Sequence, residues 1–242
     1  MTGSAEGIEL LIRAARPTNA YEETMQRLLQ SVRLGMIGPG ERLPAERDLA
    51  TMLKVSRDTV REALATLAEA GYVVSRRGRY GGTFVVEQIP PDATFGSAST
   101  APAAGEVEDV TTLRRVLEVG AAREAAGREL SAEDRAALAH ALEECSASEA
   151  AAYRRLDSRL HLLIAELSGS ASLVPLVANL RTRVNALLEE IPVLQPNIVH
   201  SNDQHRAIVA AILAGRPESA AEAMLEHVEG SSALLRGFLS RQ

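Results

Sequence analysis

Apolar side chains between residues 20 and 71 recur at spacings of three and four, the period of helices that bury one face. We predict three short helices, over residues 20–34, 45–53 and 57–70. Ser56 is a good N-cap for the third helix, and Gly71 stands at its C′ position. The side chains expected on the buried faces are Met25, Leu28, Leu29, Val32, Leu49, Met52, Leu53, Val60, Ala63, Leu64 and Leu67.

Two short runs of β-forming residues follow, at residues 72–74 and 83–86. The segment between them, residues 75–82, is basic and rich in glycine, which predicts a hairpin. Three helices followed by such a hairpin form a winged helix-turn-helix. This fold presents the N-terminal end of its third helix to the major groove of DNA.

The rest of the chain is predicted to be wholly helical after a linker rich in Pro, Gly, Ser, Ala and Thr. We expect a mainly α protein with an antiparallel bundle of about six helices at its C-terminal end. The predicted helices cover residues 108–127, 131–146, 149–169, 171–190, 197–215 and 216–238. The predicted domains are an N-terminal extension (1–19), the winged helix (20–88), the linker (89–107) and the bundle (108–238).

The charge of the chain is divided unevenly along its 242 residues. Taken for the whole chain, the net charge of -6 argues weakly against a nucleic-acid partner, but the two parts of the chain differ in charge. Residues 1–90 hold 12 basic and 11 acidic residues, whereas residues 91–242 hold 14 and 21. Between residues 42 and 82 there are 8 basic and 5 acidic residues. Basic residues are thus concentrated in the predicted DNA-binding winged helix, and the acidic residues 91–242 form a different module.

Composition also bears on the compartment. The single Cys145 excludes an intrachain disulfide and fits a reducing environment. No apolar run approaches the length of a membrane helix, and the first 17 residues lack the basic start and apolar core of a signal peptide. We therefore expect a soluble, cytoplasmic protein with no membrane partner.

The cationic residues near the predicted third helix are candidates for DNA contacts. Arg57 and Arg61 are four residues apart and share one helical face, and Arg47 precedes them. Ser56 and Thr59 can donate to phosphate at the helix start, where backbone N–H groups also attract anions. The alternative is that the three arginines only pair with Glu46, Asp58 and Glu62 on a solvated surface.

Residues 20–86 resemble the winged helix of the GntR superfamily of bacterial repressors. The resemblance rests on PGERLPAERDLATMLKVSRDTVREALATLAEAGYVVSRRGRYGGTFV, and it implies that Arg77 and Gly78 in the wing contact the minor groove. One residue departs from the family pattern. Asp58 stands where many relatives have a neutral residue: it favours the helix dipole and repels phosphate, but it can also accept from a cytosine amino group. The operator sequence is therefore left open.

A second constellation lies in the bundle. Asp157 and His161, four residues apart, project together at the edge of the apolar stripe formed by Leu156, Leu160, Leu163 and Leu167. His205 and His227 also stand beside apolar positions of their own helices. Three helices could bring one carboxylate and three imidazoles to one point, which is a usable metal site. By spacing alone, an inward histidine is more often a hydrogen-bonded core residue.

Residues 108–238 resemble the FCD ligand-binding domain of FadR-type GntR regulators. The resemblance rests on the Asp157/His161 spacing, on His205-Arg206-Ala207-Ile208, on Met224-x-x-His227 and on the opening Leu113-Arg114-Arg115-Val116-Leu117-Glu118. It implies a divalent ion held by Asp157, His161, His205 and His227, with zinc favoured and nickel or manganese possible. It also implies a small organic acid or sugar acid as effector.

An acid bound at such an ion would leave its other end for an arginine. Our first candidate for this arginine is Arg114, followed by Arg181, Arg183 and Asn202, and each could instead have a surface or capping role. We expect Glu118 to pair with a neighbouring arginine, and His140 and His200 to lie on the surface.

We predict a ligand-responsive transcription regulator that acts as a repressor and binds a palindromic operator as a homodimer. It is not expected to be an enzyme. One alternative keeps DNA binding but makes the metal itself the signal. Another is a metal-dependent hydrolase, since an open site with three histidines and a carboxylate can activate water.

Overall fold

The computed structural model describes residues 20–78, 81–90, 105–191 and 194–239. These residues divide into two compact units, a smaller N-terminal unit and a larger C-terminal one. Nine helices and two strands occur within the described ranges, so the chain is mainly α, as predicted. The N-terminal extension and most of the predicted linker lie outside these ranges.

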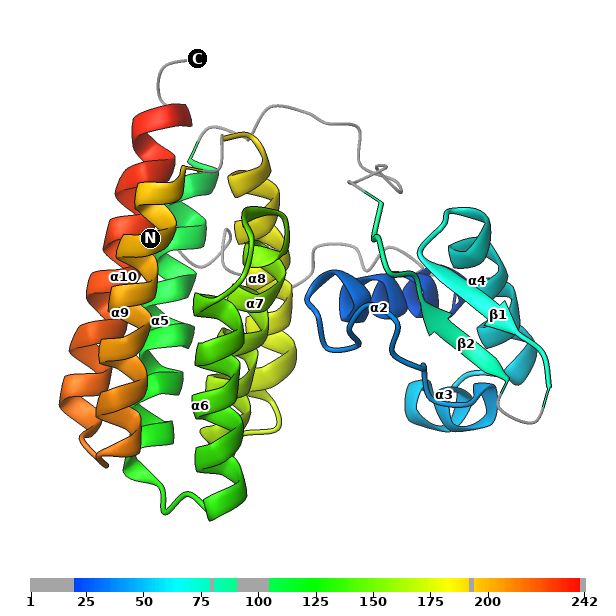
Figure 1. The fold of residues 1–242 in the computed structure, drawn as a ribbon, viewed down its shortest axis with the longest axis horizontal. Coiled ribbons are helices and arrows are strands. Elements are labelled where there is room, and N and C mark those ends of the chain that lie inside the picture. The colour runs from blue at the N-terminus through cyan, green and yellow to red at the C-terminus, as the bar shows by residue number, and fades with distance from the viewer. Residues whose placement is uncertain (1–19, 79–80, 91–104, 192–193, 240–242) are drawn as a thin grey trace, which may run out of the picture. The chain divides into compact units, whose positions relative to one another are not determined.

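The N-terminal unit is a winged helix-turn-helix (Figure 1). Its elements, in chain order, are α2 (Ala20–Arg33), α3 (Glu46–Leu53), α4 (Arg57–Glu69), β1 (Val73–Arg76) and β2 (Gly82–Val85). The two strands pair in antiparallel fashion, with Val73 opposite Val85 and Arg76 opposite Gly82. The three helices and the hairpin confirm the fold predicted for this part of the chain.

Local chemistry accounts for the limits of α4. The Ser56 hydroxyl accepts a hydrogen bond from the backbone N–H of Thr59 at 3.0 Å, as an N-cap residue does. Beyond the other end, Gly71 has a φ of +78°, a conformation that costs glycine nothing. The helix buries Val60, Ala63, Leu64 and Leu67, as the spacing predicts.

One predicted core position is wrong. Met52 was expected beside Leu49 and Leu53, but it is 68% exposed. Residues advance by roughly 100° along a helix, so Leu49, Ala50 and Leu53 share one side of α3 while Met52 falls on its flank. Only Leu49 and Ala50 are buried in this eight-residue helix, because its buried face is narrow.

The C-terminal unit is a bundle of six helices, which confirms the predicted number (Figure 1). They are α5 (Glu106–Gly127), α6 (Ala132–Ser146), α7 (Ala150–Leu167), α8 (Leu173–Glu189), α9 (Gln195–Leu213) and α10 (Pro217–Leu239). Helix α5 runs through the middle of the bundle and contacts α7, α8, α9 and α10. Its buried alanines at positions 121, 122, 125 and 126 leave room for these neighbours.

The ends of the helices match the predicted ranges to within a few residues. Ser131 and Asp134 form a capping box at the start of α6, in which each side chain bonds to the backbone N–H of the other residue. Helix α5 begins at Glu106, inside the range predicted as linker. Three acidic side chains in its first turn favour a helix start there, because they complement the helix dipole. Within the described ranges, no helix has the length and apolar character needed to cross a membrane.

Candidate functional site

Three helices of the bundle bring the four predicted metal ligands together. Asp157 and His161 come from α7, His205 from α9 and His227 from α10. One ligand atom of each residue lies within 4.8 Å of the corresponding atoms of the others, and all four side chains are buried. The spacing of four residues puts Asp157 and His161 on one face of α7, but only the packing of α9 and α10 adds the other two.

The Asp157 carboxylate lies close to two of the three histidines. Its Oδ1 is 3.2 Å from Nε2 of His205 and 3.8 Å from Nε2 of His161. The ring centroids of the three histidines are 4.6 to 5.5 Å apart. The Nε2 atoms of His161 and His205 therefore face the same carboxylate.

Several imidazole nitrogens in the cluster lack hydrogen bonds. Both ring nitrogens of His161 and of His205 are buried, and none has a partner with hydrogen-bond geometry among the described residues. Burying an unsatisfied polar group costs about 1–3 kcal/mol. A divalent ion would satisfy such lone pairs, and a carboxylate with three imidazoles is a donor set that zinc and similar ions accept. The residues present therefore fit a metal.

Burial favours the neutral form of two of these imidazoles, which is the form that binds a metal. The pKa of His227 is held well below 6.5 by burial and then by the nearby His205 and His161. Burial also lowers the pKa of His161, although the Glu118 carboxylate opposes this shift. Burial by itself would raise the pKa of Asp157, but Arg181, His205 and His161 together outweigh it and hold this pKa well below its usual value.

Buried ion pairs connect the cluster to α5 and α8. Glu118 Oε2 accepts from Nε of Arg114 at 2.6 Å, and Glu118 Oε1 lies 3.4 Å from Nη1 of Arg181. The prediction that Glu118 pairs with a neighbouring arginine is therefore confirmed. Arg181 also donates to Asp157, and Arg114 donates to the Ser231 hydroxyl.

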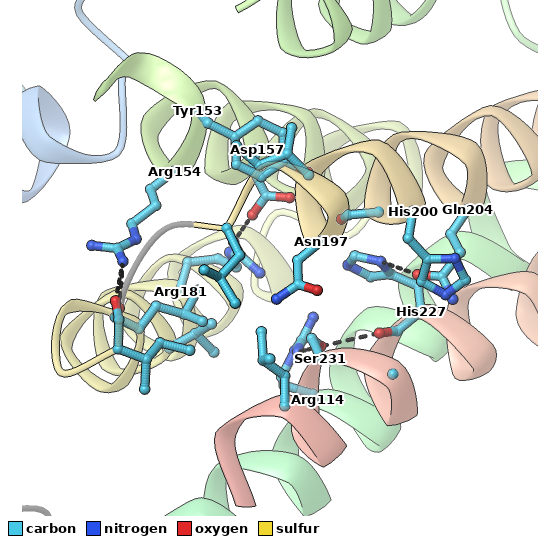
Figure 2. Close-up of a pocket in the computed structure, with 18 residues that line it drawn as sticks. Arg114, Tyr153, Arg154, Asp157, Arg181, Asn197, His200, Gln204, His227 and Ser231 are labelled. Carbon is cyan, nitrogen blue, oxygen red and sulfur yellow. Dashed lines mark hydrogen bonds and ion pairs between the residues drawn. The ribbon is translucent and has the colours of Figure 1, made fainter. Parts of the chain in front are cut away.

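A pocket adjoins the cluster and is partly open to solvent (Figure 2). It encloses about 840 Å³ of empty space, part of which is continuous with the solvent. Asp157 and His227 form part of its wall together with Arg114 and Arg181. Its apolar wall consists of Val184, Leu188, Ile191, Leu194, Ile198 and Leu234. A mostly apolar wall with a few converging polar groups is typical of small-molecule sites.

Two of the four predicted effector residues do not line this pocket. Arg183 is 37% exposed and pairs with Asp109 at 2.7 Å. It follows Arg181 by two residues, which is roughly 200° around the helix, so the two arginines cannot face the same space. We therefore withdraw Arg183. Asn202 is buried but lies outside the pocket wall, and its Oδ1 has no hydrogen-bond partner among the described residues.

Sequence reasoning missed several polar residues of the pocket. Asn197, Ser201 and Gln204 line it from α9, Tyr153 from α7 and Ser231 from α10. In Figure 2, Asn197 extends between Asp157 and Arg114. The spacing of 197, 201 and 204 is a helical polar stripe, and this signal could have identified them. His140 and His200 are exposed, as predicted, although His200 also borders the pocket.

The predicted DNA-reading residues lie on the surface of the winged helix. Arg57, Asp58 and Arg61 are exposed near the start of α4, where Ser56 caps the helix and Thr59 is partly buried. Arg47 is exposed on α3, where its Nε lies 3.3 Å from Asp48. Arg77 and Gly78 are exposed after β1, but the tip of the wing at residues 79–80 lies outside the described residues.

The alternative considered from the sequence, that these arginines form surface ion pairs with acidic neighbours, holds for one arginine of α4. Arg61 lies 3.0 Å from Asp58 and 3.3 Å from Glu46. No ion pair of Arg57 is found within the described ranges. Exposed ion pairs are worth about 0–1 kcal/mol, so DNA phosphates could replace them at small cost. The pairing of Arg61 therefore does not exclude its contact with DNA.

Comparison with known proteins assigns both units. Residues 20–85 match the family model "Bacterial regulatory proteins, gntR family", and residues 109–230 match that of the FCD domain. The protein RmpR of Mycobacterium gastri is 35% identical over 221 residues, which cover 84% of this chain and 76% of RmpR. The chain belongs to the GntR family. It is a DNA-binding transcription regulator with a C-terminal FCD domain.

Further relatives agree along most of the chain. The transcriptional repressor NanR of Escherichia coli is 30% identical over 246 residues, covering 97% of this chain and 91% of NanR. The transcriptional regulator LutR of Bacillus subtilis is 27% identical, covering 86% of this chain and 97% of LutR. The solved structure of Escherichia coli McbR/YncC shares the fold with a TM-score of 0.54 at 20% identity, covering 91% of this chain and 98% of that one.

Proposed function

We propose that this regulator responds to a small organic acid that binds at a divalent metal ion held by Asp157, His161, His205 and His227. The observation that carries the proposal is the buried convergence of these four side chains beside a pocket. Zinc is favoured by the mixed carboxylate and imidazole donors, and nickel and manganese are alternatives. The ion would leave positions for an acid oxygen.

Charge balance supports an anionic effector. Among the described residues, the buried side chains that carry a full charge are Arg114, Arg181, Glu118 and Asp157, and their charges cancel. A divalent ion adds two positive charges in a poorly solvated place, where uncompensated charge is costly. Both arginines already pair with carboxylates. The charge of the ion, more than a free guanidinium, is therefore the main attraction for an acid.

We propose that the operator is contacted by the exposed polar and cationic residues of the winged helix. These residues are Arg47, Ser56, Arg57, Asp58, Thr59, Arg61, Arg77 and Gly78. One recognition helix reads few base pairs, so we expect a homodimer on a palindromic operator. Because the chromosome is its target, we propose that the protein acts in the cytoplasm.

Control of DNA binding would follow from a shift between arrangements of the bundle. The pocket is lined by residues of α5, α7, α8, α9 and α10, so a ligand there contacts five of the six helices. An effector shifts the equilibrium only by its differential affinity for the two arrangements. The change in operator affinity therefore reports this difference, and operator DNA must change effector affinity by the same factor.

The first test measures metal content. We expect the purified protein to hold one divalent ion per chain, and His161→Ala to lower this content sharply, while His140→Ala does not. His140 is an exposed histidine of α6 and serves as the matched control. Elemental analysis showing equal metal in His161→Ala and the unsubstituted protein would contradict the site.

The second test separates the effector from the ion. Operator affinity is measured after chelation, after reloading with Zn²⁺, and after reloading with Zn²⁺ plus a panel of small carboxylates. A change that requires both Zn²⁺ and an acid supports the proposal. A full response to Zn²⁺ alone would make the metal the signal. LutR and NanR are regulators by name, so the hydrolase considered from the sequence is not proposed.

A further inference from the structure

Two side chains outside the set of four ligands face the histidines from behind. Oε1 of Glu118, on α5, lies 3.0 Å from Nδ1 of His161. Oε1 of Gln204, on α9, lies 3.2 Å from Nδ1 of His227. In both pairs an oxygen acceptor stands beside Nδ1, while Nε2 of His161 faces the Asp157 carboxylate.

An oxygen in this position selects one tautomer. A neutral imidazole carries a single N–H, and the other ring nitrogen keeps the lone pair that a metal needs. A carboxylate or amide oxygen beside Nδ1 stabilises the N–H there and leaves the lone pair on Nε2. The acceptor also restrains rotation of the ring. His161 and His227 each have such an acceptor on a helix other than their own.

Glu118 is itself held in place. Both of its oxygens contact arginines, Oε2 with Arg114 at 2.6 Å and Oε1 with Arg181 at 3.4 Å. Its side chain is 1% exposed. Burial opposes ionisation of Glu118, but Arg114, His161 and Arg181 together hold its pKa well below the ordinary value. An ionised, fixed carboxylate is the stronger acceptor for an imidazole N–H.

Gln204 is less buried than Glu118, and its amide packs against Gly230 of α10, which has no side chain. A Cβ atom placed on Gly230 of α10 would come within 3.4 Å of its Nε2. The Gln204 contact with His227 has hydrogen-bond geometry, whereas the Glu118 contact with Nδ1 of His161 is a close approach of 3.0 Å without that geometry. Among the described residues, Nδ1 of His205 has neither a hydrogen bond nor an ion pair, so it differs from the other two imidazoles in having no acceptor oxygen beside Nδ1.

We propose that Glu118 and Gln204 are positioning residues that fix His161 and His227 in the tautomer presenting Nε2 to the ion. This inference rests on the proposed metal site, since it gives the two residues a role only toward that ion. Through Glu118, the same contacts tie His161 to both arginines of the pocket wall. Loss of such partners of a ligand histidine typically costs 10–100-fold in metal affinity.

The variants are Glu118→Met, which removes the acceptor; Glu118→Gln, which keeps an oxygen without the charge; and Gln204→Met. Exposed residues on the same helices provide matched controls, Glu124→Met on α5 and Gln195→Met on α9. Thermal unfolding confirms that each variant is folded. Gln204 is partly exposed, so its variant is expected to fold even if Glu118→Met does not.

Two measurements are made on each folded protein. Zn²⁺ affinity comes from competition with a chelator, and long-range ¹H–¹⁵N NMR of the chelated protein reports the imidazole tautomers. We expect Glu118→Met and Gln204→Met to bind Zn²⁺ about 10–100-fold more weakly, with Glu118→Gln in between and both controls unchanged. We also expect the Nδ1–H tautomer of His227 in the unsubstituted protein to be lost in Gln204→Met.

The outcomes separate the inference from the proposed function. If the unsubstituted protein does not bind Zn²⁺ or another divalent ion, the proposed site is wrong, whatever the tautomers are. If it binds Zn²⁺ but Gln204→Met and the folded Glu118 variants bind equally well, the positioning role is overturned. Nε2–H tautomers of His161 and His227 in the chelated protein would overturn it as well.

Discussion

Arg114 and Glu118, four residues apart on α5, form an ion pair in which both side chains are only 1% exposed and Nε lies 2.6 Å from Oε2. Removing Arg114 leaves the buried Glu118 carboxylate with only the longer contact of 3.4 Å to Arg181, and loss of one partner of a buried ion pair costs about 3–5 kcal/mol. We therefore expect Arg114→Met to lower the free energy of unfolding by this amount in urea titrations.

Two further variants test the physical reason. Arg114→Met combined with Glu118→Met should recover part of the loss, because the buried carboxylate that lost its nearest partner is gone and Arg181 keeps Asp157 as a partner. Arg123→Met, on the same helix, breaks an exposed pair with Glu218 and should cost below about 1 kcal/mol. Equal losses for Arg114→Met and Arg123→Met would contradict this interpretation.

The buried histidines predict a dependence of stability on pH. The pKa values of His161 and His227 are lowered from 6.5 in the folded protein, mainly by burial. Below about pH 6.5 the unfolded chain binds more protons than the folded one, so stability must fall as pH decreases. The slope is at most about 1.4 kcal/mol per pH unit for each imidazole.

The measurement is urea unfolding of the chelated protein between about pH 7 and pH 5, a range that spans the unfolded-state histidine pKa of 6.5. His227→Gln should flatten the slope, whereas the exposed His140→Gln should leave it unchanged. Asp157 and Glu118 have lowered pKa values, so their stabilising contribution persists through this range and is lost only at more acidic pH. An unchanged slope in His227→Gln would show that another group causes the dependence.

Arg57 of α4 is exposed, and no ion pair of its guanidinium is found within the described ranges. It can therefore contact DNA without first losing an ion pair. We expect Arg57→Ala to weaken operator binding and, if it contacts phosphate, to reduce the slope of log affinity against log salt by about 1. The operator for this test is the sequence selected from random duplexes by the protein. Fluorescence anisotropy across a salt series gives the affinities.

The control for Arg57→Ala is Arg27→Ala, which removes an exposed arginine of α2 paired with Glu23. Both variants lose one positive charge, so a general charge effect would weaken DNA binding equally. A larger effect of Arg57→Ala supports the proposed recognition face. The same affinity for the two variants at every salt concentration would count against it.

Substitution of Asp58 can distinguish the two roles that the sequence left open for this residue. Its carboxylate is exposed and pairs with Arg61 at 3.0 Å. If it chiefly repels phosphate, Asp58→Asn should raise affinity for operator and random duplexes alike. If it accepts from a cytosine, operator affinity should fall by about 1–3 kcal/mol while affinity for random DNA does not fall. Competition of the two duplexes at one salt concentration distinguishes these results.

Much of the fold was predictable because its signals are local. The spacing of Val60, Ala63, Leu64 and Leu67 shows which side of α4 is buried, and Ser56 and Gly71 mark its limits. The number of helices in the bundle also followed from apolar period and from breaks at Gly and Pro. Met52 shows the limit of this reasoning, because a short helix with a narrow buried face leaves its flank exposed.

The candidate site was predictable only in part. The four donor residues could be chosen from the sequence by type, inward position and family resemblance, and the structure brings them together. The pocket could not, because its wall combines residues from five helices that are distant in the sequence. The sequence alone did not distinguish Arg181 from Arg183 as candidates. The helical turn of α8 directs Arg181 into the pocket and Arg183 outward to Asp109.

The amino-acid sequence alone determined the winged helix, the helical bundle and the residues suited to bind a metal, since each depends on short-range period, capping and side-chain chemistry. Tertiary packing decided which of those side chains have partners. Glu118 lies 43 residues before His161 in the chain, but it stands 3.0 Å behind its ring. Such a contact depends on how α5 packs against α7, and no local pattern encodes that distance.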